Sequence, residues 1–339
     1  MESAAWDMSE DGFTRECYPA ITVIRPLRPS SATKEIPVTL DIMMPFYGRV
    51  DHFQAAVRSV LAQVDPDWRL VVIDDHDPDE TAGRWLRGLA DPRIIYRRNP
   101  INLGINANFQ ASIDLAENEW LTIFGCDDVM LPDYVGRITQ LIQEHPTVAF
   151  IHPGTRVIDE HGQVSTPLVD RVKSLYRPRF HGSLELAGEP LAVSITRGNW
   201  MNFPAIAWNR SAVTAVGFRP DFSIVQDLGL ALDLAVRGGS LLLDDQVVFE
   251  YRRHASSVSS WRAADGSRFA EEQGFFRGLA VEFNGHGWPR AARAARLHLS
   301  SRVNALTRIP DAVRARRSDG IRILLRHALG LTVAATPRD

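Results

Sequence analysis

The sequence predicts an α/β fold in which a mainly parallel sheet is flanked by helices and followed by a helical C-terminal extension. Between about residues 38 and 133, short apolar runs alternate with amphipathic stretches of helical length, an order typical of parallel sheets. After residue 261, apolar residues recur at helix spacing. The 339 residues can bury a large core, as one large domain or two modest ones.

The elements are expected in a regular β-α-β-α-β-α-β order. The strands are the apolar runs at residues 38–44, 69–73, 94–97 and 120–124. The helices between them are expected at residues 51–63, 81–89 and 106–116. Because crossovers between parallel strands are right-handed, the turns after these strands gather along one edge of the sheet. Open α/β sheets bind their ligands at that edge.

Composition divides the chain into four parts. Residues 1–36 contain several prolines and serines and are expected to form an arm, in which residues 21–24 favour an edge strand. The α/β region is expected to have two halves, residues 37–132 and 133–260. Residues 261–339 form the basic helical extension.

Two adjacent carboxylates, Asp127 and Asp128, follow the apolar run at residues 120–124. Paired acids at the end of a buried strand are costly unless a positive charge lies against them. A divalent cation that carries a phosphate would supply that charge, since Mg²⁺ and Mn²⁺ prefer oxygen ligands. The alternative is a solvated loop in which an aspartate caps the following helix.

Several classes of protein are disfavoured. The region lacks the glycine-rich loops typical of dinucleotide or ATP sites. The net charge of -3 gives no indication of nucleic-acid binding, and Cys17 and Cys126 are too few for a disulfide framework. Apolar runs stay shorter than the ~20 residues of a membrane span, and the acidic residues 1–11 do not resemble a signal peptide. We therefore expect a cytoplasmic protein.

Six segments in order resemble family 2 of the inverting glycosyltransferases, which have the GT-A fold. The resemblance covers about residues 38–260. The segments are Pro45-Phe46-Tyr47, Asp74-Asp75, Asn102 with Gly104 and Asn108, Asp127-Asp128 before Leu131-Pro132-Asp133, Gly217-Phe218 before Gln226-Asp227, and Tyr251-Arg252-Arg253-His254-Ala255-Ser256-Ser257.

The resemblance implies transfer of a sugar from a nucleotide diphosphate sugar to an acceptor hydroxyl, assisted by Mn²⁺ or Mg²⁺. Asp227 corresponds to the general base of the family, and Asp127 and His254 correspond to its metal ligands. Residues 37–132 would bind the nucleotide sugar and residues 133–260 the acceptor. The expected nucleotide-sugar-binding residues are Pro45, Phe46, Tyr47, Asp74, Asp75, Asn102, Asn108, Asp128 and Arg252.

The acids and amides that follow the strands also have structural explanations. Asp74 and Asp75 could form a turn, and Asn102 and Asn108 could make Asx turns or caps. In the family reading, one of the two acids, most often the second, binds uracil N3–H. The sequence leaves both explanations open.

The C-terminal candidates have alternatives as well. Asp227 could cap the helix expected at residues 228–237, where the helix dipole would lower its pKa and weaken it as a base. Arg252 matches phosphate geometry but could form a surface ion pair. His254 could bond a backbone carbonyl instead of a metal.

Two positions depart from the family pattern. Gly125 stands where the metal motif usually has its first acid, so a contact to the ribose or to the metal is weaker or is supplied elsewhere. Gln226 stands where an acid commonly precedes the base, but Asp227 itself is retained.

Trp200 and Asn202 are candidates for binding the acceptor, because an aromatic ring beside an amide suits a sugar face and its hydroxyls. A buried core tryptophan explains the same residues equally well.

The basic extension is expected to form helices at residues 268–282 and 291–306, followed by a stripe made of Ile321, Leu324, Leu325, Ala328 and Leu331. A basic amphipathic helix can lie on the inner face of an anionic membrane. The alternative is that the stripe packs against the protein core or in a homo-oligomer.

The function expected from the sequence is therefore metal-assisted, inverting glycosyl transfer to a surface glycan, a lipid-linked glycan or a glycosylated metabolite. A nucleotidyltransferase is the alternative enzyme, although Pro45 to Arg49 makes a poor phosphate loop. A non-catalytic nucleotide-sugar-binding protein is the alternative outside enzymes, and Gly125 is the residue that supports it.

Overall fold

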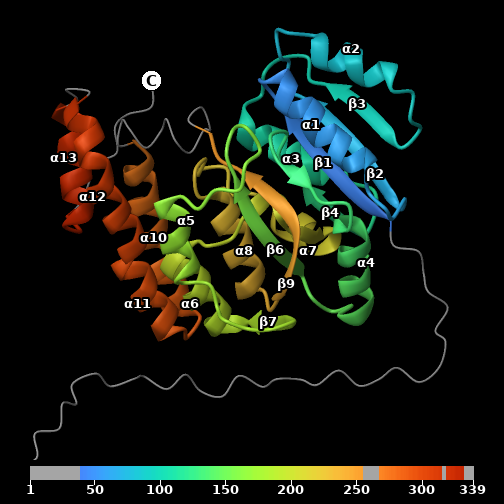
Figure 1. Ribbon diagram of the computed structural model, residues 1–339. Coiled ribbons are helices and arrows are strands. Elements are labelled where there is room, and N and C mark those ends of the chain that lie inside the picture. The colour runs from blue at the N-terminus through green and yellow to red at the C-terminus, as the bar shows by residue number, and fades with distance from the viewer. Residues whose placement is uncertain (1–38, 255–266, 315–317, 332–339) are drawn as a thin grey trace, which may run out of the picture. The chain divides into compact units, whose positions relative to one another are not determined.

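A mixed sheet of nine strands runs through the structure, a computed structural model that describes residues 39–254, 267–314 and 318–331 (Figure 1). These residues belong to one unit, Pro37–Asp339. The expected strand at 21–24 and the family segment beyond His254 lie outside the described residues.

The strand order is β3-β2-β1-β4-β8-β6-β9-β5, with β7 paired to β9. β1 to β4 are mutually parallel, β8 is antiparallel to β4 and β6, and β9 is parallel to β6. β5 and β7 are antiparallel to β9. The strands are β1 (Leu40–Phe46), β2 (Trp68–Asp74), β3 (Ile94–Arg98), β4 (Trp120–Ile123), β5 (Val129–Met130), β6 (Phe150–Ile158), β7 (Ser183–Ala187), β8 (Ala207–Asn209) and β9 (Ser240–Arg252).

In the first half of the chain, helices and strands alternate in the predicted order. Every element predicted there is confirmed, with small shifts of its ends. The helices up to β9 are α1 (Val50–Leu61), α2 (Thr81–Gly88), α3 (Ile105–Leu115), α4 (Tyr134–Glu144), α5 (Leu168–Ser174), α6 (Gly188–Gly198), the 3-10 turn η1 (Phe203–Ala205), α7 (Arg210–Val216) and α8 (Gln226–Val236). The extension contains α10 (Ser267–Gly285), α11 (Pro289–Leu297), α12 (Leu299–Arg314) and α13 (Ser318–Ala328).

The first two strands are buried on both faces, and their side chains alternate between two hydrophobic clusters. Leu70 and Val72 of β2 belong to the cluster that α1, α2 and α4 complete, whereas Val71 and Ile73 belong to the cluster that α6, α8 and α10 complete. This is the period of two expected of a strand covered on both sides.

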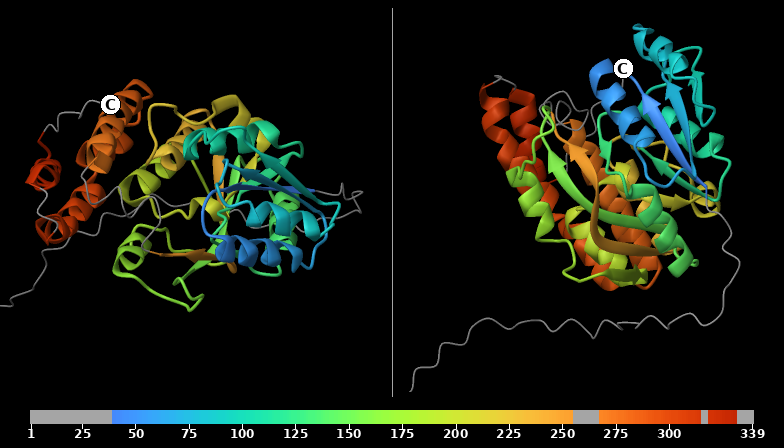
Figure 2. Two further views of the ribbon diagram at one scale, coloured as in Figure 1. Left: turned by 90° about the horizontal axis from the view of Figure 1, so that it is seen from above. Right: turned by 45° about the vertical axis from the view of Figure 1, so that its right-hand side comes forward.

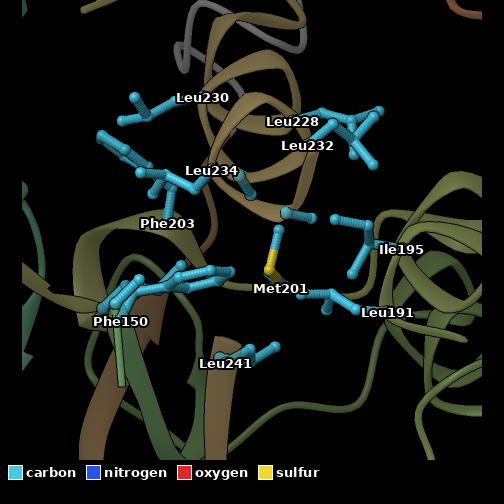
Figure 3. Packing of buried hydrophobic residues seen from close by; sticks show 14 of the residues in the cluster. Phe150, Leu191, Ile195, Met201, Phe203, Leu228, Leu230, Leu232, Leu234 and Leu241 are labelled. Carbon is cyan, nitrogen blue, oxygen red and sulfur yellow. The ribbon is translucent and has the colours of Figure 1, made fainter. Parts of the chain in front are cut away.

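The second cluster carries α8, the helix on which the predicted base lies. Leu228 and Leu232 of α8 face Ile195 of α6, and Met201 lies below them (Figure 3). All four side chains are at most 5% exposed. The packing fixes the first turn of α8 against α6 and the segment that follows it.

The prediction of a single helix at residues 291–306 is wrong, because the structure has two helices there that are divided at His298. This residue has a φ of +29°, and its N–H donates to the carbonyl of Ala294, which ends α11. The chain then restarts as α12 at Leu299.

The apolar stripe of α13 packs largely on the chain itself. Leu324 is fully buried in a small cluster with Phe269, and Ile321 and Ala328 pack against that cluster. Leu325 and Leu331 remain exposed. Figure 2 shows α12 and α13 beside each other. Within the described residues, no helix is both long and apolar enough to cross a membrane.

A buried polar network joins α10, α12 and α13. Arg268 donates to Glu272 at 2.6 Å, and the hydroxyl of Ser301 donates to the other carboxylate oxygen of Glu272. His327 then donates from Nε2 to Ser301 Oγ at 2.8 Å. Burial lowers the pKa of His327 to about 4, and the His298 ring lies 5.2 Å away. At neutral pH, His327 is therefore neutral in the folded protein.

This network predicts a pH-dependent stability. Because the pKa of His327 is near 6.5 in the unfolded chain and about 4 in the folded chain, the unfolded chain binds more protons between these values. The contribution of His327 to the free energy of unfolding is fully present above pH 6.5. It is lost as the pH drops towards 4, and the loss is on the order of 2–3 kcal/mol. Urea unfolding at several pH values measures this loss. His327→Gln should reduce it, whereas His286→Gln, an exposed histidine on the same extension, should leave it unchanged.

Candidate active site

The carboxyl ends of β1 and β2 are tied together through their backbones and through Asp75. The Asp75 N–H donates to the carbonyl of Phe46 at 2.9 Å. The Asp75 carboxylate accepts the N–H groups of Leu103 and Gly104 at 2.8 and 2.9 Å, and the amide of Asn99 at 2.8 Å. Asp75 is 2% exposed. It therefore holds the loop after β3 against the end of β2.

Asp74 and Asp77 anchor the neighbouring turns. Asp74 accepts the N–H of Asp77 at 2.8 Å and the hydroxyl of Tyr96. Asp77 in turn accepts the N–H of Gly48 at 2.6 Å, which fixes the turn after β1. Asp77 could not be singled out from the sequence, since an acid in a turn rich in aspartates carries no distinguishing signal.

The two asparagines expected here differ in their surroundings. Asn108 is 2% exposed and donates to the carbonyl of Ile73 at 3.0 Å, so it clamps α3 to β2. Asn102 is exposed and accepts the N–H of Gly104 at 3.0 Å, an Asx turn.

The turn after β1 presents one ring to solvent. Tyr47 is 56% exposed, whereas Phe46 is 1% exposed and packs on Phe53. Pro45 is half-buried. Among these three side chains, Tyr47 is the one placed for stacking on a ligand.

Asp127 and His254 meet at the end of β4, although 127 residues separate them in the sequence. His254 Nε2 donates to Asp127 Oδ2 at 2.7 Å. Both residues are half-buried. The sequence prediction assigned them as the two metal ligands.

Asp128 lies deeper, at 1% exposed. Its Oδ1 accepts the N–H of Arg252 at 2.7 Å, and its Oδ2 has no hydrogen-bond partner among the described residues. Burial, and then the charge of Asp127, raise the pKa of Asp128 well above its usual range. A Cβ added at Gly125 would overlap the Asp128 carboxylate. The position of Asp128 thus accounts for the glycine.

Arg252 works as a clamp. Its Nε donates to the carbonyl of Asp127 at 2.6 Å, and its Nη1 donates to the carbonyl of Asp159 at 3.0 Å. The residue is 7% exposed. These contacts bind the loop after β4 to the end of β9 and direct the guanidinium towards backbone oxygens.

The residues present are compatible with a divalent cation. Asp127 and Asp128 supply carboxylate oxygens and His254 an imidazole nitrogen, which suit Mg²⁺ or Mn²⁺. The unpartnered Oδ2 of Asp128 is an unsatisfied buried acceptor that a cation would satisfy. Within the described ranges, the side chains do not form a group of three such ligands close enough to hold a metal as they stand.

Asp227 is the second residue of α8 and is half-buried. Its Oδ1 accepts the N–H of Leu228 at 2.8 Å, while Val225 occupies the cap position. Burial raises the pKa of Asp227, against the Leu228 bond, the charge of Lys173 and a hydrogen bond from Asn199. The alternative explanation, a helix cap with a lowered pKa, is therefore wrong, because Val225 is the cap residue and burial raises the pKa of Asp227.

Two residues that act on Asp227 were not predicted from the sequence. Asn199, at a φ of +25°, ends α6 and hydrogen-bonds to Asp227. Lys173 of α5 interacts with both Asp227 and Arg253, and burial lowers its pKa to about 8. Arg253 also donates to Asp170 at 2.7 Å. These charges connect the surroundings of Asp227 with the end of β9, a relation that spacing in the sequence does not reveal.

Trp200 and Asn202 are both held by hydrogen bonds to neighbouring side chains. Trp200 is 5% exposed in the second cluster, and its Nε1 donates to Ser194 at 3.2 Å. The N–H of Asn202 donates to the buried Nε2 of His152 at 2.9 Å, and its side chain accepts from Thr155. The tryptophan is therefore part of the core, and the half-buried Asn202 is the more available of the two.

Residues 41–202 match the family described as Glycosyl transferase family 2. An uncharacterized protein of Mycobacterium tuberculosis is 25% identical over 233 residues, or 66% of this chain and 69% of that protein. The abequosyltransferase RfbV of Salmonella typhimurium is 32% identical over 99 residues, 28% of this chain and 29% of its own length.

A solved structure of S. aureus TarS 1-349, in complex with UDP-GlcNAc, has a similar fold. It matches with a TM-score of 0.53 and 12% identity, covering 87% of this chain and 93% of that one. At this identity the likeness concerns the fold alone. Residues 41–202 thus match glycosyl transferase family 2, and they belong to a chain with a GT-A-like fold.

Proposed function

We propose that the protein transfers a sugar from a nucleotide diphosphate sugar to an acceptor hydroxyl with inversion. The observation that carries the proposal is the contact between His254 Nε2 and Asp127 Oδ2 at 2.7 Å, in a fold where Asp227, a carboxylate whose pKa is raised by burial, lies in the first turn of α8. A surface glycan, a lipid-linked glycan or a glycosylated metabolite would provide the hydroxyl.

In the proposed reaction, the acceptor oxygen bonds to the anomeric carbon while the bond from that carbon to the phosphate oxygen breaks. The electron pair leaves with the nucleoside diphosphate, and the hydroxyl proton passes to Asp227. One carboxylate is sufficient, because the nucleophile and the leaving group do not share a proton. The raised pKa of Asp227 strengthens it as a proton acceptor.

Asp127 and His254 would hold a divalent cation, with Asp128 behind them. When bound, the cation would supply positive charge to the leaving diphosphate. Arg252 holds the loop after β4, which carries Asp127 and Asp128, to the end of β9. The exposed ring of Tyr47 and the loop after β3, which Asp75 holds, would border the nucleotide.

The two alternatives are less well supported. A nucleotidyltransferase would need a phosphate loop after β1, but the turn there is held by Asp77 and carries only Gly48 as a glycine. A non-catalytic binding protein would have no need for a half-buried Asp227 held by Asn199.

Asp227→Asn tests the base. It keeps the size of the side chain but removes proton acceptance, so kcat should fall by about 10²-fold or more while donor affinity barely changes. Asp233→Asn on the same helix, which loses an ion pair to Arg219, should alter stability rather than kcat. Near-normal turnover by purified Asp227→Asn would exclude the assignment.

Asp127→Ala tests the cation. Calorimetry of uridine diphosphate with and without Mn²⁺ should show a metal-dependent gain of affinity in the wild type that the variant lacks. Asp133→Ala, which removes an exposed carboxylate six residues further along, is the control and should retain the gain. An unchanged Mn²⁺ dependence in Asp127→Ala would contradict the proposal.

The hydrogen bonds of Asp75 allow a prediction of which nucleobase the donor carries. Its carboxylate accepts three hydrogen bonds in this structure, and two carboxylate oxygens can accept about four. The remaining position suits the N3–H of uracil or thymine, which cytosine lacks. Uridine diphosphate should bind about tenfold or more tightly than cytidine diphosphate. Equal affinities would refute this role for Asp75.

A further inference from the structure

Apolar side chains form a stripe along the solvent side of α12. Their positions follow one another at intervals of four, three, four and three residues, which places them on one face of a helix. Four of them are 51–55% exposed, and the fifth, a proline, is exposed as well. These residues, the outer stripe of α12, are Leu299, Val303, Leu306, Pro310 and Val313.

The opposite side of α12 is buried and carries small residues. Ala305 and Ala312 are at most 1% exposed and lie in a small hydrophobic cluster. The hydroxyl of Ser301 donates to Glu272 of α10 and accepts from His327 of α13 at 2.8 Å. The helix therefore cannot turn its outer stripe inwards without breaking these buried contacts. A row of large apolar side chains held on the surface in this way indicates a binding surface.

The outer stripe is too small for a stable contact with a second copy of the chain. A helix of 16 residues is about 24 Å long and about 10 Å wide with its side chains, so one face measures a few hundred Å². A typical specific interface buries about 800 Å² on each partner. The stripe alone therefore does not provide the area that a dimer needs.

The charge around α12 also opposes a second copy and favours an anionic surface. Residues 289–331 contain ten arginines and two aspartates but no lysine or glutamate, whereas the whole chain has a net charge of -3. Arg314 is exposed and directly follows Val313, the last residue of the stripe. Two copies that met here would repel each other, whereas the surface of an anionic bilayer attracts arginines.

We propose that the outer stripe of α12 binds the protein to the surface of an anionic membrane. The apolar side chains would enter the boundary between headgroups and acyl chains, and the arginines around them would lie among the lipid phosphates. The sequence suggested the stripe of residues 321–331 for this contact, but most of that stripe packs on the chain itself. The inference concerns where the protein is held and does not depend on the proposed chemistry of Asp227.

Sedimentation of the full chain with lipid vesicles tests the proposal. At about 0.1 M salt, the wild type should bind vesicles made of equal parts of phosphatidylglycerol and phosphatidylcholine. It should bind vesicles of phosphatidylcholine alone about tenfold or more weakly, because these carry no net charge. Binding to the anionic vesicles should also weaken about tenfold or more at about 1 M salt, where charges are screened beyond about 3 Å.

Leu306→Gln removes apolar area from the middle of the stripe and should weaken binding to the anionic vesicles about tenfold. Leu168→Gln is the matched control, because Leu168 is an exposed leucine of another helix, α5, and lies outside the stripe. It should leave binding unchanged. Since both leucines are exposed, neither substitution should change the melting temperature by more than about 2 °C.

Light scattering without lipid tests the competing occupant, a second copy of the chain. A wild type that stays monomeric and binds the anionic vesicles through Leu306 supports the proposal. Failure of the wild type to sediment with these vesicles, or equal binding by the two leucine variants, would overturn it. A dimer that Leu306→Gln dissociates would overturn it as well.

Discussion

Carboxylates that accept backbone N–H groups hold together the edge of the sheet where β1, β2 and β4 end. Asp75 fixes the loop after β3, Asp77 fixes the turn after β1, and Asp128 fixes the end of β9. A charged acceptor makes a stronger bond to an N–H than a neutral one. Under the proposed function, a cation or a nucleotide would meet the same charges, so one set of side chains would serve both anchoring and binding.

Because these carboxylates are closely surrounded, the edge of the sheet tolerates few substitutions beside them. Asp128 occupies the space that a side chain at position 125 would need. The glycine is therefore a steric condition for a buried Asp128, and its presence does not by itself indicate a lost site. The departure from the family pattern has a local physical cause.

The first half of the fold could be predicted because its signals are local. Each strand from β1 to β4 is a mainly apolar run, and each is separated from the next by a segment of helical length. The second half was not predicted in detail. β8 has only three residues, too few to show a period, yet it is inserted between β4 and β6. The break at His298 was missed because a histidine seldom adopts a positive φ.

In the candidate site as well, residues in local motifs could be predicted, whereas contacts between residues distant in sequence could not. Motifs identified Asp127, His254 and Asp227, and the fold brings the first two into contact. The direction of the pKa shift of Asp227 could not be predicted, because it is set by burial among residues distant in sequence. Lys173 and Asn199 had no local signal at all.

The length of β9 has a consequence for how the chain folds. This strand pairs with β5, β6 and β7, and its last residues complete the surroundings of Asp127 and Asp128. The two carboxylates remain without these partners until more than a hundred further residues have been synthesised. Pairings of such high sequence separation form slowly. During synthesis, the half of the sheet built from β1 to β4 can form early, and the binding edge is completed only after β9 has joined it.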